Sequence, residues 1–108
     1  MSLRRTDWIL IGADIGFKHY DDDNTDLIDA YSMQSYKGDI TFLVDGMGGE
    51  YFVVGEVVAY GDEYDGFRIT EITSEKFQEA VERLEDFLKI TFDIDDVKPK
   101  LIAVTHYT

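Results

Sequence analysis

The chain of 108 residues contains no cysteine, and this absence excludes three kinds of chemistry. Without thiols, the fold has no disulfides, a metal cannot be bound by thiolates, and no cysteine can act as a nucleophile. Long apolar runs are also missing, since none approaches the roughly 18 residues that a membrane-spanning helix needs. The N-terminus lacks the pattern of a secretory signal. We therefore expect a soluble, cytoplasmic protein that folds by packing alone and does not interact with membranes.

Basic residues are scarce, because ten Lys and Arg stand against 23 Asp and Glu and leave a net charge of −13. This sign repels phosphate backbones, so direct binding to nucleic acid is not expected. The imbalance is concentrated between residues 21 and 66, where Lys37 is the only base among twelve acids and the net charge is −11. A segment of one sign predicts a basic protein partner, although solubility alone would also explain it.

The length and composition predict one domain with a true core. Hydrophobic residues make up 44% of the chain and aromatic residues 14%, which is enough apolar surface for a core in spite of the charge. Met1-Ser2-Leu3 has the character of a vector-derived start. We therefore expect a single domain over residues 4–108.

The apolar pattern predicts an α+β fold in which a mainly antiparallel sheet of about four to five strands and two helices form a single layer packed on one face. In the strand 50–60 both faces are apolar, so we expect it to be central, with a bulge at Gly55 and Glu56. Thr73 or Ser74 should cap the clearest helix. The strands are predicted at 8–11, 40–44, 50–60, 67–72 and 101–104, and the helices at about 25–35 and 74–91.

The stretch from Tyr60 to Gly66 combines two tyrosines and three carboxylates in a glycine-bounded turn. Tyrosine offers a large, rigid contact area, and carboxylates steer and recognise arginine, so this composition suits a protein-binding loop. A merely solvated hairpin turn is the alternative. The partner-binding residues predicted from this turn and from the acidic run before the first helix are Tyr60, Asp62, Glu63, Tyr64, Asp65, Asp21, Asp22 and Asp23.

The sequence predicts no metal site and no cofactor. The run from Asp21 to Asp26 offers oxygen ligands, but an EF-hand loop would need glycine in place of Asp26 and glutamate in place of Ser32. An irregular, weak cation site is the alternative to a solvated, helix-capping acidic loop. Gly12 and Gly16 lack the third glycine and the lysine of a phosphate-binding loop.

Two other classes of function stay open from the residues alone, and no catalytic residue is assigned. A small enzyme or ligand-binding domain could use His19, His106 or Glu56, because a histidine paired with a carboxylate can act as a general acid or base. Glu56 is the lone charge in an apolar strand, and at an edge or bulge it would point to water. The other class is a self-assembling subunit that pairs exposed strand edges. The oligomeric state itself is not predicted.

Three pieces of the chain resemble small acidic uncharacterised proteins of bacteriophages and prophages of Gram-positive bacteria. The resemblance lies in residues 7–12, in residues 45–55 with Asp45-Gly46-Met47, Glu50-Tyr51 and Gly55, and in residues 63–67. It carries over no catalytic residue. It implies a protein that binds a host protein, in some cases by presenting carboxylates where a host enzyme expects DNA phosphates. The leading prediction is therefore a non-enzymatic acidic interaction module that binds a basic partner, such as a nucleic-acid-handling protein.

Overall fold

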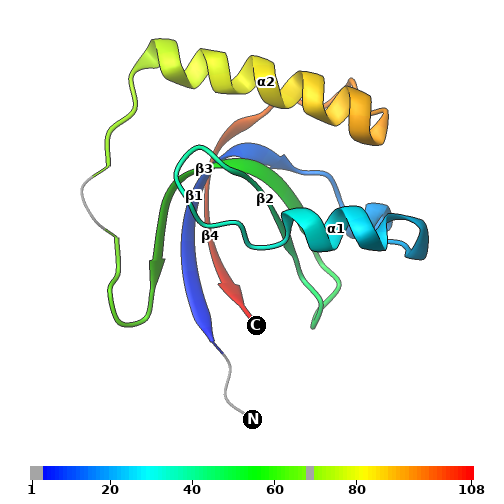
Figure 1. Cartoon of the computed structure of the whole chain (residues 1–108), viewed down its shortest axis with the longest axis horizontal. Coiled ribbons are helices and arrows are strands. Elements are labelled where there is room, and N and C mark those ends of the chain that lie inside the picture. Colours follow the sequence, from blue (N-terminus) through cyan, green and yellow to red (C-terminus); the bar gives the residue numbers. More distant parts are fainter. Residues whose placement is uncertain (1–3, 68–69) are drawn as a thin grey trace.

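A computed structural model describes residues 4–67 and 70–108 of the chain. Within these ranges the chain forms a four-stranded sheet, two α-helices and two short 3-10 helices (Figure 1). This arrangement confirms the predicted α+β class. In chain order the elements are β1 (Arg5–Asp14), η1 (Phe17–His19), η2 (Asp22–Asn24), α1 (Thr25–Tyr31), β2 (Ile40–Val44), β3 (Phe52–Asp62), α2 (Ser74–Phe92) and β4 (Lys100–Tyr107).

All strand pairs in the sheet are antiparallel, and the strand order is β2-β3-β1-β4. The predicted hairpin of β2 and β3 is confirmed, and β3 is central as expected. β1 is longer than predicted, because it continues through Gly12 to Asp14 and pairs with both β3 and β4. Pairing on both sides is what an extended apolar strand needs to satisfy its backbone groups.

The predicted strand over residues 67–72 is wrong for the residues that can be judged. Phe67 and residues 70–72 belong to no strand, while residues 68–69 lie outside the described ranges. β1 pairs with one edge of β3 from Val53 to Asp62, whereas β2 pairs with the other edge only from Phe52 to Glu56. Residues 70–72 do not pair with the remaining part of that edge, because they lead to α2, and Ile72 lines a cavity together with Lys76 of that helix.

The predicted bulge at Gly55 and Glu56 is also wrong. Gly55 pairs in register with Gly12, and the irregularity lies instead opposite Ile9 and Leu10, whose partners on β3 are Ala59 and Val57. Val58 is therefore the extra residue. The helix expected over 25–35 ends at Tyr31, because the chain leaves it to follow β2, with the Met33 amide donating to the Phe42 carbonyl at 3.2 Å.

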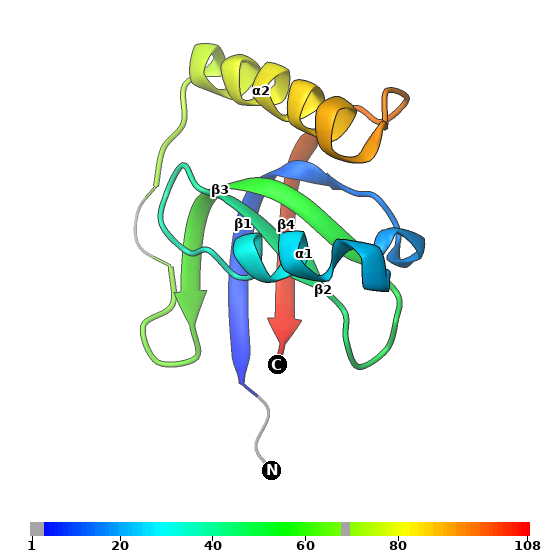
Figure 2. The ribbon, with the colours of Figure 1, turned by 45° about the vertical axis from the view of Figure 1, so that its right-hand side comes forward.

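Both helices pack on the same face of the sheet and form the larger part of the core (Figures 1 and 2). Phe42 of β2 lies at their meeting point, since its ring stacks on Tyr31 of α1 at 5.0 Å and meets Phe87 of α2 at 6.1 Å. The stripe predicted for α2 is confirmed. Its buried residues, which pack over β1 and β3, are Ala80, Val81, Leu84 and Leu88.

A second buried cluster lies on the opposite face and includes no described helix residue. Trp8 and Leu10 are fully buried there, and the Trp8 indole donates to Thr6 Oγ1 at 2.9 Å. The cluster is covered because the sheet curls over itself, as the bent strands in Figures 1 and 2 show. Its buried members are Trp8, Leu10, Leu43, Val53 and Val57.

The contact between Tyr51 and His106 measures how strongly the sheet curls. Tyr51 precedes Val53, which pairs with Asp14 at the end of β1, whereas His106 pairs with Thr6 near its start. In a flat sheet these positions would be about 26 Å apart along β1, at about 3.3 Å per residue. Yet the Tyr51 hydroxyl lies 2.6 Å from His106 Nδ1. Two diagonal corners of the sheet therefore meet.

Candidate functional site

The two tyrosines of the turn at residues 60–66, which we call the acidic turn, have different surroundings. Tyr60 is half-buried, with its ring 4.6 Å from that of Trp8 and its hydroxyl accepting a hydrogen bond from Arg4 at 3.4 Å. Tyr64 is 87% exposed. Tyr60 therefore belongs to the packing of the sheet, and Tyr64 is the aromatic side chain that the turn presents to solvent.

Asp62 holds the backbone of the acidic turn. Its Oδ1 accepts hydrogen bonds from the amides of Asp65 at 2.8 Å and Tyr64 at 2.9 Å, and these two bonds lower the pKa of its carboxyl group. Gly66 closes the turn with a positive φ of 64°, and its amide donates to the Asp62 carbonyl at 3.0 Å. Asp62 therefore stays ionised and orders the tip, while Glu63, Tyr64 and Asp65 are exposed on it.

The acidic run at residues 21–23 lies on the other side of the molecule from the acidic turn. In Figures 1 and 2 the acidic turn is at the lower left, and the segment of η1 and η2 is at the right. Asp21 caps η2, because its Oδ1 accepts from the Asn24 amide at 3.1 Å. Asp22 and Asp23 are exposed. The structure therefore does not bring the two predicted acidic groups together into one surface.

His106 is a buried histidine, with 3% of its surface exposed. Its hydrogen-bond partner is the Tyr51 hydroxyl, and burial lowers the pKa of the imidazole against an opposing effect of the Asp45 carboxylate. Burial and the Asp45 charge together raise the pKa of Tyr51. Asp45 itself accepts from the amides of Gly48 and Glu50, which hold its own pKa low and fix the β2–β3 turn. No spacing in the sequence signals this pair, because its members are 55 residues apart.

The other two residues of the enzyme alternative have unrelated surroundings. The His19 ring meets Phe92 edge-on at 5.9 Å, beyond the end of β1. Glu56 does not point to water as expected, because its side chain is only 13% exposed and receives two hydrogen bonds from Arg83 of α2, at 2.8 and 3.2 Å. The structure therefore places His19, His106 and Glu56 at three separate sites, each with its own partner.

Within residues 4–67 and 70–108, no group of three or more histidine or acidic side chains is arranged to hold a metal ion. No described helix is long and apolar enough to cross a membrane. Comparison of the chain with protein-family models, with curated proteins and with solved structures finds no match.

Proposed function

We propose that the chain is a non-enzymatic interaction module that binds a basic protein partner through its acidic turn. The observation that carries the proposal is the exposure of Tyr64 at the tip of a turn whose backbone is already ordered by Asp62. An ordered loop loses little conformational freedom on binding, and a protruding tyrosine is a common interface anchor. Glu63 and Asp65 on either side add the charges that would face basic residues of the partner.

The distribution of charge supports a basic partner. The acidic turn ends the segment of residues 21–66, whose net charge is −11. A field of this size attracts a basic surface and speeds its encounter with the turn. Proteins that handle nucleic acid present such surfaces, and we propose one of them as the partner class. A phage or prophage origin stays a prediction, and the proposed binding mode does not depend on it.

The test begins with a lysate of a candidate host cell, from which the immobilised full chain should retain a basic protein. We expect Tyr64→Ala with Glu63→Gln and Asp65→Asn to weaken binding by at least about 2 kcal/mol, as loss of an interface anchor does. Asp62 is left in place because it orders the turn. The thermal midpoint should not change, since the three altered side chains are exposed. Calorimetric titration and thermal melting measure the two quantities.

Tyr36→Ala is the matched control, because Tyr36 is a second exposed tyrosine, at 79%, outside the acidic turn. It should bind the partner as the unaltered chain does. Binding should also weaken steeply between about 0.05 M and 0.3 M salt, because exposed charges are screened within about 8 Å at physiological ionic strength. The proposal would be contradicted if no basic protein were recovered at low salt. It would also be contradicted if the triple variant of the acidic turn bound the partner as well as Tyr36→Ala does.

A further inference from the structure

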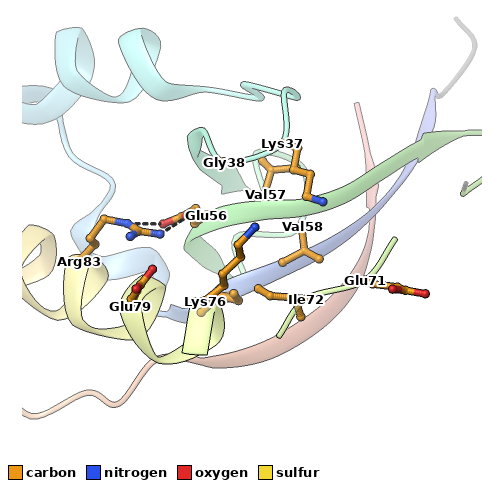
Figure 3. Close-up of a pocket in the computed structure, with 11 residues that line it drawn as sticks. Lys37, Gly38, Glu56, Val57, Val58, Glu71, Ile72, Lys76, Glu79 and Arg83 are labelled. Carbon is orange, nitrogen blue, oxygen red and sulfur yellow. Dashed lines mark hydrogen bonds and ion pairs between the residues drawn. The ribbon is translucent and has the colours of Figure 1, made fainter. Parts of the chain in front are cut away.

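A cavity of about 270 Å³ lies between the first turns of α2, the strand β3 and the loop that precedes β2 (Figure 3). Its apolar wall includes Ile11, Val58 and Ile72. Three of the ten basic residues of the chain also line it, namely Lys37, Lys76 and Arg83. Among them is Lys37, the lone base of the acidic segment 21–66. Three acidic residues, Glu56, Glu71 and Glu79, line the cavity as well, so the six charged side chains balance and their positions decide which charge the cavity presents.

The two lysines reach the cavity from opposite sides. In Figure 3 the ammonium groups of Lys37 and Lys76 extend toward the same region beside Val58, from the loop and from α2 respectively. Neither ammonium group has an ion pair among the described residues. Arg83 differs, because Glu56, which also lines the cavity, accepts two hydrogen bonds from it.

Backbone hydrogen bonds fix the attachment points of both lysines. The Gly38 amide donates to the Val57 carbonyl at 2.9 Å, and the Val57 amide donates to the Asp39 carbonyl at 2.8 Å, so the loop after Lys37 is tied to β3. The Lys76 amide donates to Thr73 Oγ1 at 3.2 Å in the first turn of α2. The two ammonium groups therefore extend from ordered backbone.

The charges around the cavity favour an anion with a single charge. Glu56 neutralises Arg83, and Glu71 points away from the cavity in Figure 3. Glu79 lies near Arg83 and helps to raise the pKa of that guanidinium. Lys37 and Lys76 together with Glu79 then leave one positive charge. The net charge of −13 on the whole chain repels every anion, and it repels a polyanion more strongly than a monoanion.

We propose that this cavity binds a small organic monoanion, a carboxylate on a short apolar body, with Lys37 and Lys76 at the carboxylate and Ile11, Val58 and Ile72 around the body. The volume sets the size of the ligand, because pockets for drug-sized molecules start at about 300 Å³. A chain of a few carbon atoms fits this space, whereas a nucleotide does not. This site is independent of the acidic turn.

The test is an NMR titration of the full ¹⁵N-labelled chain with sodium hexanoate. Saturable shifts are expected at the amides of Gly38, Val57 and Val58, with a millimolar dissociation constant suited to so small a ligand. Hexanamide, the neutral match, and adipate, the dianion of the same length, should each bind at least about fivefold more weakly. The absence of saturable shifts up to about 20 mM hexanoate would overturn the proposal, since a ligand of eight heavy atoms should bind within that range.

Three single variants locate the site. Lys37→Gln and Lys76→Gln should each weaken hexanoate binding about fivefold, as loss of one exposed charge partner does. Lys18→Gln removes the same charge at an exposed position away from the cavity and should change the affinity less than about twofold. The ¹⁵N spectra report whether each variant is folded. Equal weakening by all three variants would indicate a general charge effect, and equal binding of hexanamide would indicate an apolar site, and both results overturn the monoanion site.

Discussion

Gly12 and Gly55 face each other across β1 and β3, where neither strand has room for a side chain. A Cβ atom at Gly12 would lie 2.1 Å from the Val54 carbonyl oxygen, and one at Gly55 would lie 2.9 Å from the Leu10 Cβ. Glycine is therefore required by close approach of the two backbones, as occurs in sheets that curl. This requirement belongs to the pairing of two distant strands, so the sequence gives no sign of it.

We predict that Gly12→Ala destabilises the fold by about 2 to 3 kcal/mol, because the clash is with backbone and strand positions must shift. Gly46→Ala is the control, since a Cβ atom there meets nothing within 4 Å. That change should alter the free energy of unfolding by less than about 0.5 kcal/mol. Urea denaturation followed by circular dichroism measures both. Similar urea midpoints for the two variants would contradict the close approach of the β1 and β3 backbones at Gly12.

His106 makes stability depend on pH, and the direction follows from its pKa. Burial lowers that pKa in the folded state below the ordinary value of about 6.5. Between the two values the unfolded chain binds more protons than the folded chain, so stability rises with pH in this window. We therefore expect the urea midpoint to fall as the pH is lowered from about 7 through 6.5 toward the folded-state pKa.

The same titration with His106→Gln isolates this effect. The variant should lose the part of the pH dependence that lies below about 6.5, whereas His19→Gln, which changes the half-buried histidine next to Phe92, should keep it. Asp7, Asp45 and Asp62 also have lowered pKa values, but their contributions are lost at lower pH, near the range of carboxylates. An unchanged slope in His106→Gln would refute the assignment.

At the scale of elements, the structure of α2 agrees closely with the helix that its sequence predicts. Its apolar stripe has the helical period, and Thr73 begins it by accepting the Lys76 amide at 3.2 Å. Asp93, in the left-handed conformation with φ of 56°, ends it. The sequence left Thr73 and Ser74 as equal candidates for the cap, because both residue types cap helices well. The backbone conformation decides between them.

We predict that Thr73→Ala destabilises the protein by about 1 kcal/mol, the usual cost of losing an N-cap hydrogen bond. Ser74→Ala, one residue inside the helix, should have little effect, because alanine favours helix and no cap bond is lost. Thermal melting of the two variants compares them directly. A larger loss of stability for Ser74→Ala than for Thr73→Ala would show that Ser74, and not Thr73, caps the helix.

At the scale of the whole molecule, β4 is an edge strand, because it pairs with β1 on one side and ends the strand order. Leu101 and Tyr107 are exposed on it, and Lys100 is its only lysine or arginine. Such an edge could pair with a second copy, as the self-assembly alternative requires. The net charge of −13 opposes that pairing, because two copies repel each other.

We therefore predict a monomer of 12.4 kDa at low ionic strength. Light scattering after size-exclusion chromatography over about a hundredfold range of concentration should give one constant mass, because association depends on concentration. The same measurement at about 1 M salt, where charges are screened beyond about 3 Å, tells two causes of the monomer apart. A dimer that forms only at high salt would show that charge repulsion prevents association, and a monomer at both salt concentrations would show that the edge of β4 does not pair with a second copy. A mass that doubles with concentration at low salt would favour the self-assembling subunit.

The sequence by itself determined the features that depend on neighbours along the chain. The period of 3.6 residues predicted α2, alternation and turn residues predicted the β2–β3 hairpin, and counting charges located the acidic segment 21–66. The acidic turn was recognisable as a turn because glycines bound it. These features follow from local backbone preference and from which face of an element is apolar, so a single sequence contains them.

Only the tertiary structure decided the features that join distant parts of the chain. β1 pairs along β3, Phe67 and residues 70–72 join no strand, and the curl of the sheet brings Tyr51 to His106. Packing of α2 on the sheet places Arg83 beside Glu56. Tyr60 packs on Trp8, whereas Tyr64 of the same turn stays exposed. Each contact depends on strand order and on curvature. Both result from the burial of two apolar faces at once, which no local pattern specifies.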